Sequence, residues 1–92
     1  MLIADLLQRG EENGVKMNEL KGLTGMRNRE LRRKIELERR AGTPILSSCK
    51  TGYFLPGTDD ERVRCVRSLR HRAGEILRTA AAIEKGFIEV HD

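Results

Sequence analysis

The chain has 92 residues, with 18 lysines and arginines against 14 acidic residues, and a net charge of +4. This length fits one domain with one modest core. Only 3% of the residues are aromatic, which argues against a deep ligand pocket or a base-stacking surface. No apolar run is long enough to span a membrane, and the N-terminus lacks the basic flank of a secretion signal. Two cysteines suit a reducing compartment, so we expect a cytoplasmic protein without a membrane partner.

Apolar residues at helical spacing predict two short helices near the N-terminus. The first covers residues 2–7 and ends before Gly10. The second covers residues 18–24 and ends at Gly25, which tolerates the positive φ of a sharp turn. Between them, an Asn-Gly pair signals a turn, after which Val15 is expected to add one strand-like residue.

A third helix is predicted from about residue 28 to residue 40, just before Gly42. Leu31 and Ile35 lie one turn apart and give it an apolar face, and Asn28 is the best available N-cap. Residues 27–40 hold seven basic residues against three acidic ones, which is +4 and equals the net charge of the whole chain. Such a basic stripe is expected for a protein that binds a polyanion. A solvated helix face with Glu–Arg pairs is the alternative.

The apolar period changes after Gly42. Residues 43–48 and 53–56 have the composition of two strands around a turn, which predicts a hairpin. Thr58 and Glu61 then have the spacing of a capping box, which predicts a long helix over about residues 59–85.

The long helix carries an apolar seam with alternating spacings of three and four residues. This is the heptad pattern of a coiled coil, which indicates a homodimer, whereas packing of the seam on its own domain is the alternative. Residues 62–72 are basic, which favours an antiparallel pair over a parallel one. The same basic residues could instead contact phosphate or only keep the chain soluble. The expected interface residues are Val66, Leu69, Ala73, Ile76, Ala80 and Ile83, and the seam could extend to Phe87.

Three helices, a hairpin and a long helix make the fold mainly α (α+β), on the plan of a winged helix–turn–helix. Residues 1–57 are expected to form this domain, and residues 58–92 the long helix with a frayed tail. The inside of the helix–turn–helix corner is assigned to Leu20, Leu23 or Thr24, Met26, Leu31 and Ile35.

The stretch from Leu20 to Ile35 and the later run Gly52-Tyr53-Phe54-Leu55 together resemble a known family. They are similar to the winged helix–turn–helix at the N-terminus of the biotin operon repressor, and to small winged-helix proteins of phages and mobile elements. The likeness covers about residues 1–57, with no ligase domain after it. The sequence departs from the family pattern at Lys21, Arg27 and Glu38. The carboxylate of Glu38 is expected to be half-exposed beside a neighbouring arginine.

The resemblance implies that residues 28–40 form a recognition helix in the major groove of double-stranded DNA. It also implies that a wing at residues 44–55 touches the backbone or the minor groove. Arginine can bond guanine through two atoms and asparagine can do the same to adenine, whereas Lys34, Arg39 and Arg40 are expected at phosphates. The expected DNA-binding residues are Arg27, Asn28, Arg29, Arg32, Arg33, Glu36, Arg40, Lys50 and Thr51.

The sequence therefore predicts a small dimeric regulator of transcription or replication that binds specific DNA sequences. A protein-interaction adaptor that docks through its winged helix is the alternative, and RNA binding is weaker because stacking aromatics are few. No enzyme, cofactor, metal or small-molecule ligand is expected, since phosphate-loop and dinucleotide motifs are absent from the sequence. The histidines and cysteines lack the paired spacing of a zinc site. These residues are Cys49, Cys65, His71 and His91.

Overall fold

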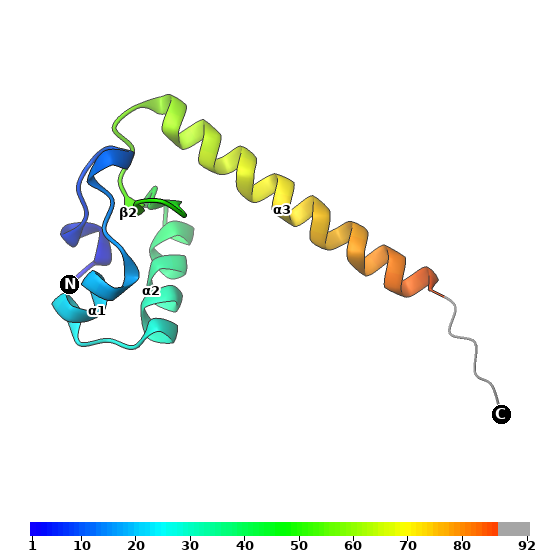
Figure 1. Cartoon of the computed structure of the whole chain (residues 1–92), viewed down its shortest axis with the longest axis horizontal. Helices are drawn as coiled ribbons and strands as arrows, with labels where there is room; N and C mark the ends of the chain where they lie inside the picture. Colours follow the sequence, from blue (N-terminus) through cyan, green and yellow to red (C-terminus); the bar gives the residue numbers. More distant parts are fainter. Residues whose placement is uncertain (87–92) are drawn as a thin grey trace.

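The computed structural model describes residues 1–86. Over this range the chain is mainly helical, with one two-stranded antiparallel sheet, which confirms the α+β class (Figure 1). The last residues of the sequence, among them Phe87 and the predicted tail, lie outside the described range. The elements are the 3-10 turns η1 (Ile3–Leu6) and η2 (Glu11–Asn13), the helices α1 (Met17–Thr24) and α2 (Asn28–Arg40), the strands β1 (Leu46–Ser48) and β2 (Gly52–Phe54), and the helix α3 (Asp59–Lys85).

The core lies where η1, α1, α2 and the hairpin meet. The first predicted helix is shorter than expected, a single 3-10 turn, but it buries its apolar side as the spacing predicts. The core is built of aliphatic side chains and one aromatic ring: Ile3, Leu7, Val15, Leu20, Leu31, Ile35, Ile45, Leu46 and Phe54.

The expected position of Glu38 is wrong. Its side chain is buried on the inner face of α2, at 6% exposure, and does not pair with an arginine. Its carboxylate instead accepts the backbone N–H groups of Ile3 and Ala4, at 2.7 and 3.0 Å. The first amides of a helical turn lack partners within the turn, so these two bonds make the burial of a carboxylate tolerable.

The corner between α1 and α2 follows the prediction, with Thr24 and not Leu23 on its inside. Leu23 is 56% exposed. The Thr24 hydroxyl donates to the carbonyl of Leu20 at 2.7 Å and accepts the N–H of Met26 at 3.1 Å. Gly25 ends α1 in the left-handed conformation, at φ +71°, which a side chain would disfavour.

The predicted N-cap of α2 is displaced by one residue. Arg27 occupies the cap position and Asn28 is the first helical residue, so Asn28 does not cap the helix. The Arg27 side chain makes no capping hydrogen bond, which leaves the first amides of α2 without a side-chain partner.

The hairpin is shorter than predicted and is held by segments on both sides. β1 and β2 pair in antiparallel register, with Leu46 opposite Phe54 and Ser48 opposite Gly52. Val15 bonds to Tyr53 through both backbone groups at 2.8 Å, which confirms its predicted strand-like role. Pro44 and Pro56 lie outside the paired residues of the two strands, so their missing N–H groups remove no hydrogen bond from the sheet.

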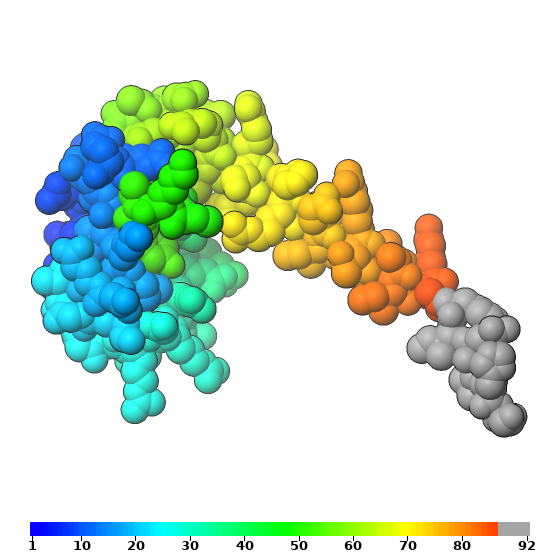
Figure 2. All heavy atoms as spheres, in the orientation of Figure 1, coloured from blue at the N-terminus to red at the C-terminus, as the bar shows by residue number. Residues whose placement is uncertain are grey.

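The long helix α3 begins at the predicted capping box and then leaves the rest of the molecule. The Thr58 hydroxyl accepts the N–H of Glu61, and the Glu61 carboxylate accepts the N–H of Thr58. No residue of α3 is buried, and its far half stands clear of the folded body (Figures 1 and 2). The described chain is accordingly elongated, with extents of 58 × 32 × 25 Å. None of the helices in residues 1–86 has the apolar length that a bilayer crossing needs.

Candidate nucleic-acid interface

The outer face of α2 is basic and open to solvent. Leu31 and Ile35 anchor the opposite face in the core, so residues half a turn away point outward. Arg29 and Arg33 lie on this outer face, are exposed, and form no ion pair within residues 1–86. The helix therefore presents two arginines whose charge is not neutralised by the described part of the chain.

Two further predicted residues on this face pair with each other. The guanidinium of Arg40 lies 2.6 Å from the Glu36 carboxylate, one turn away, and both side chains are well exposed. Such an exposed pair contributes little to stability, and in this arrangement it lowers the net charge of the C-terminal end of the face. The N-terminal half of α2 is consequently its more positive part.

The start of α2 adds polar groups to the same surface. Arg27 and Asn28 are both exposed there. Because no side chain caps the helix, its first amides remain available to water or to an anion. The first turn thus combines an arginine, an amide side chain and open backbone donors.

Arg32 lies on the hairpin side of α2, at a hollow of about 480 Å³ between the helix and the hairpin. The hollow opens to solvent, and α1, α2 and both strands contribute hydrogen-bonding side chains to its lining. Besides Arg32, it is lined by Lys16, Asn18, Ser47, Ser48 and Tyr53. Lys16 and Asn18, at the start of α1, were not among the residues predicted for this surface. The strand-like Val15 was the signal that could have placed them beside Tyr53.

Arg39 is not available for phosphate, contrary to the prediction. Its Nε donates to the carbonyl of Ile45 at 2.6 Å, and a terminal nitrogen reaches the Ser47 hydroxyl at 3.3 Å. The side chain is half-buried, so it ties the end of α2 to β1. Lys34 is likewise half-buried, toward the core side of the helix.

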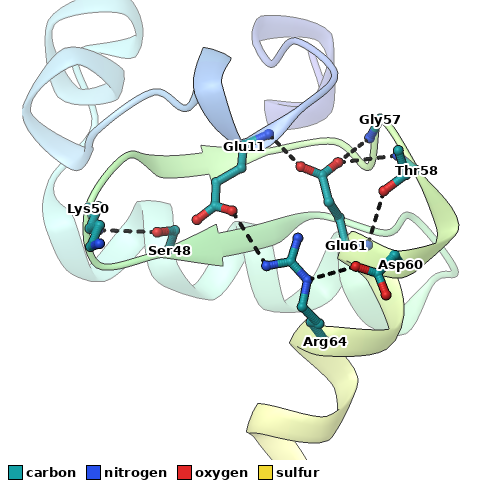
Figure 3. Close-up of polar contacts among 8 residues, drawn as sticks. All are labelled: Glu11, Ser48, Lys50, Gly57, Thr58, Asp60, Glu61 and Arg64. Atoms are coloured by element: carbon teal, nitrogen blue, oxygen red, sulfur yellow. Dashed lines mark hydrogen bonds and ion pairs between the residues drawn. The ribbon is translucent and has the colours of Figure 1, made fainter.

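The two predicted residues at the hairpin tip differ in accessibility. Lys50 is exposed, and its backbone N–H donates to the Ser48 hydroxyl at 3.2 Å, which closes the turn (Figure 3). Thr51 is half-buried beside Gly14, and its hydroxyl oxygen is buried without a hydrogen-bond partner in the described structure. Lys50 is therefore the tip residue that can reach a ligand directly.

The basic first half of α3 is partly neutralised. Arg62 pairs with Asp59 at 2.7 Å and Arg64 with Asp60 at 3.1 Å. The exposed Arg67, Arg70 and Arg72 form no ion pairs within residues 1–86.

The base of α3 is fastened by one carboxylate. Glu61 accepts the N–H of Glu11 at 2.8 Å and that of Gly57 at 2.7 Å, and Arg64 lies near the Glu11 carboxylate at 3.9 Å (Figure 3). The N–H of Glu11 is the largest cause that holds the pKa of Glu61 below its usual value of 4.5, followed by that of Gly57, while partial burial opposes the shift.

Elsewhere in residues 1–86, no group of three or more histidine, cysteine or acidic side chains is placed to hold a metal ion. Both cysteines are free thiols, Cys49 exposed and Cys65 half-buried. Comparisons with protein-family models, with curated proteins and with solved structures find no significant match for this chain.

Proposed function

We propose that this chain is a winged helix–turn–helix protein that binds specific sequences of double-stranded DNA. In this proposal α2 lies in the major groove, and the β1–β2 hairpin is the wing. The observation that carries the proposal is the pair Arg29 and Arg33, exposed on the outer face of α2 and free of ion pairs within the described chain. A basic helix face of this kind is the expected electrostatic footprint of a DNA reader.

The shape around α2 supports the proposal. The helix packs on η1 and α1 through its inner face only, so its outer face is not covered by those elements. Its 13 residues span about 20 Å at 1.5 Å per residue, and a B-DNA major groove is wide enough to admit such a helix. α1 meets it at the Gly25 corner, which suits a helix that supports a reader from behind.

The contacts divide into two kinds. Asn28, Arg29 and Arg33 stand in the first half of α2 and are proposed to meet base edges, since recognition helices read DNA mainly through their N-terminal residues. Arg32, beside the hairpin, and Lys50, at its tip, are proposed to meet phosphates, which position the protein without specifying sequence.

The experiment is selection of bound sequences from a pool of random duplex DNA with the full chain. We expect enrichment of a common motif by the unmodified protein. The double variant Arg29→Ala/Arg33→Ala should lose this enrichment. The double variant Arg78→Ala/Lys85→Ala removes the same charge far along α3, and it should keep the motif.

Absence of any duplex binding at low salt would overturn the proposal and favour the adaptor role. Equal loss in both double variants would show that only total charge matters, which would overturn sequence-specific reading by α2.

A further inference from the structure

An apolar stripe on α3 remains uncovered in the described structure. Ile76 is 63% exposed and Ile83 is 74% exposed, while Val66 and Leu69, nearer the domain, are 37% and 42% exposed. The stripe occupies one seam of the helix and runs for about 26 Å at 1.5 Å per residue. Because no residue of α3 is buried, the alternative in which the seam packs on its own domain does not hold for the seam as a whole.

A helix in this situation lacks the usual source of helical stability. Isolated helices are marginal in water, and most helices in proteins are stabilised by packing of an apolar face. The far half of α3 has no such packing within residues 1–86. Packing of the seam against an apolar surface from outside the chain would supply this stabilisation.

We propose that the occupant is α3 of a second copy of this chain, in antiparallel orientation. A two-fold axis between Gly74 and Glu75 places every seam residue opposite another seam residue. In this register Val66 faces the partner's Ile83, Leu69 faces the partner's Ala80, and Ala73 faces the partner's Ile76.

The side-chain volumes favour this register over a parallel one. Leu69 and Ile76 each meet an alanine of the partner, so large and small side chains alternate across the interface and can fill it. A parallel pair would instead set Ala73 against Ala73 and Ala80 against Ala80. Those layers would leave gaps between helices held apart by the larger layers.

The charge distribution favours the same orientation. Residues 62–72 contain five arginines and no acidic residue, whereas residues 77–85, at the other end of α3, carry a net charge of only +1 from Arg78, Glu84 and Lys85. A parallel pair would bring the two arginine-rich halves side by side, which is repulsive. An antiparallel pair sets each of them beside the partner's far half instead.

The folded domain provides a continuation of the seam. Val66 and Leu69 line an open hollow of about 280 Å³ together with Pro44, Ile45 and Leu46. In the antiparallel register, the partner's Ile83 and Ala80 lie opposite Val66 and Leu69, and hence next to this hollow. The second copy would thus cover apolar surface on both the helix and the domain.

The state of association can be measured by sedimentation equilibrium on the full chain. The unmodified protein should be a dimer at high micromolar concentration. Ala80→Asp places a carboxylate against the partner's Leu69 in the apolar seam and should weaken the dimer at least about 100-fold. Ala82→Asp introduces the same charge two positions away, off the seam, and should remain dimeric. Because both alanines are exposed in the single chain, neither change touches the core.

An unmodified protein that is monomeric at this concentration would overturn the proposal, and so would equal effects of the two aspartates. Neither result bears on the proposed DNA contacts of α2, which the duplex selection tests separately.

Orientation is tested by disulfide cross-linking in a Cys49→Ser/Cys65→Ser background. Chains carrying Leu69→Cys are mixed with chains carrying Ala80→Cys and are oxidised. The antiparallel register predicts disulfides between the two kinds of chain. Disulfides only between like chains would overturn this register and indicate a parallel pair.

Discussion

The carboxylate of Glu38 accepts the backbone N–H of Ile3 at 2.7 Å, across 35 positions of the sequence. It also accepts the N–H of Ala4 at 3.0 Å, so one buried side chain of α2 supplies acceptors to two adjacent amides of η1. The start of a helical turn carries partial positive charge, which a carboxylate complements. The N-terminal segment is therefore attached to the helix that we propose as the DNA reader.

Glu38→Gln is expected to destabilise the fold by about 1–3 kcal/mol. The glutamine amide can offer only one acceptor oxygen, and its NH₂ group would face a backbone donor, which leaves a buried N–H unsatisfied. Urea unfolding measures the change. Glu36→Gln removes the same charge from the exposed side of α2 and should cost no more than about 0.5 kcal/mol. Equal losses would show that the charge of α2, and not the buried bonds, is responsible.

Two glycines of the α1 region should respond to alanine in opposite directions. Gly25 has φ +71°, so Gly25→Ala forces a side chain into the left-handed region and should destabilise by about 1–2 kcal/mol. Gly22 lies inside α1, and a Cβ there meets nothing within 4 Å. Gly22→Ala should therefore stabilise by about 0.5–1 kcal/mol. Thermal unfolding of both variants checks the signs, and a stabilising Gly25→Ala would contradict the turn geometry.

The attachment of α3 should depend on pH through Glu61. Its pKa is lowered in the folded chain, chiefly by the N–H of Glu11 and then by that of Gly57. A carboxyl group with a lowered folded pKa contributes stability above its unfolded pKa, near 4.5, and loses it as the pH falls through the folded value. Glu61→Gln should thus be less stable than the unmodified protein at pH 6, and the difference should shrink toward pH 3. Urea unfolding at both pH values measures it, and a constant difference would argue against this role of the charge.

If the proposed division of contacts is correct, alanine variants of base-contacting and phosphate-contacting residues should change the salt dependence of DNA binding differently. Arg33→Ala should weaken specific binding by roughly 1–3 kcal/mol, because Arg33 is proposed to meet a base edge. Lys50→Ala should weaken binding to all sequences alike and lower the salt slope by about 1. Fluorescence titrations at several salt concentrations distinguish the two, with Arg78→Ala as the control for lost charge. If Lys50→Ala leaves the salt dependence of DNA binding unchanged, the hairpin tip does not contact phosphate.

Most elements of the fold could be predicted because the signals for them lie within a few adjacent residues of the sequence. The Gly25 turn, the capping box at Thr58 and the single strand residue at Val15 are all of this kind. The errors at Glu38 and Arg39 concern long-range partners. Glu38 and Arg39 looked like surface charges, and only tertiary structure brings Ile3 to the first and Ile45 to the second.

The candidate site was predictable to the same extent. The helical period alone placed Arg29 and Arg33 on the outer face of α2. The period could not show that Arg32 faces the hairpin, nor that Lys16 joins it there, because that depends on how β2 packs beside Val15.

The three backbone amides held by Glu61 set the direction in which α3 leaves the domain. In the proposed dimer the two copies of Arg62 would be separated by about 38 Å along the helix axis, close to one turn of B-DNA. The rotational phase of the two reading helices would then be set by residues that never touch DNA. One residue inserted between Glu61 and Val66 would turn each domain by about 100° around α3. The dimer would then bind a DNA site with two half-sites more weakly, although every DNA-contacting side chain is unchanged.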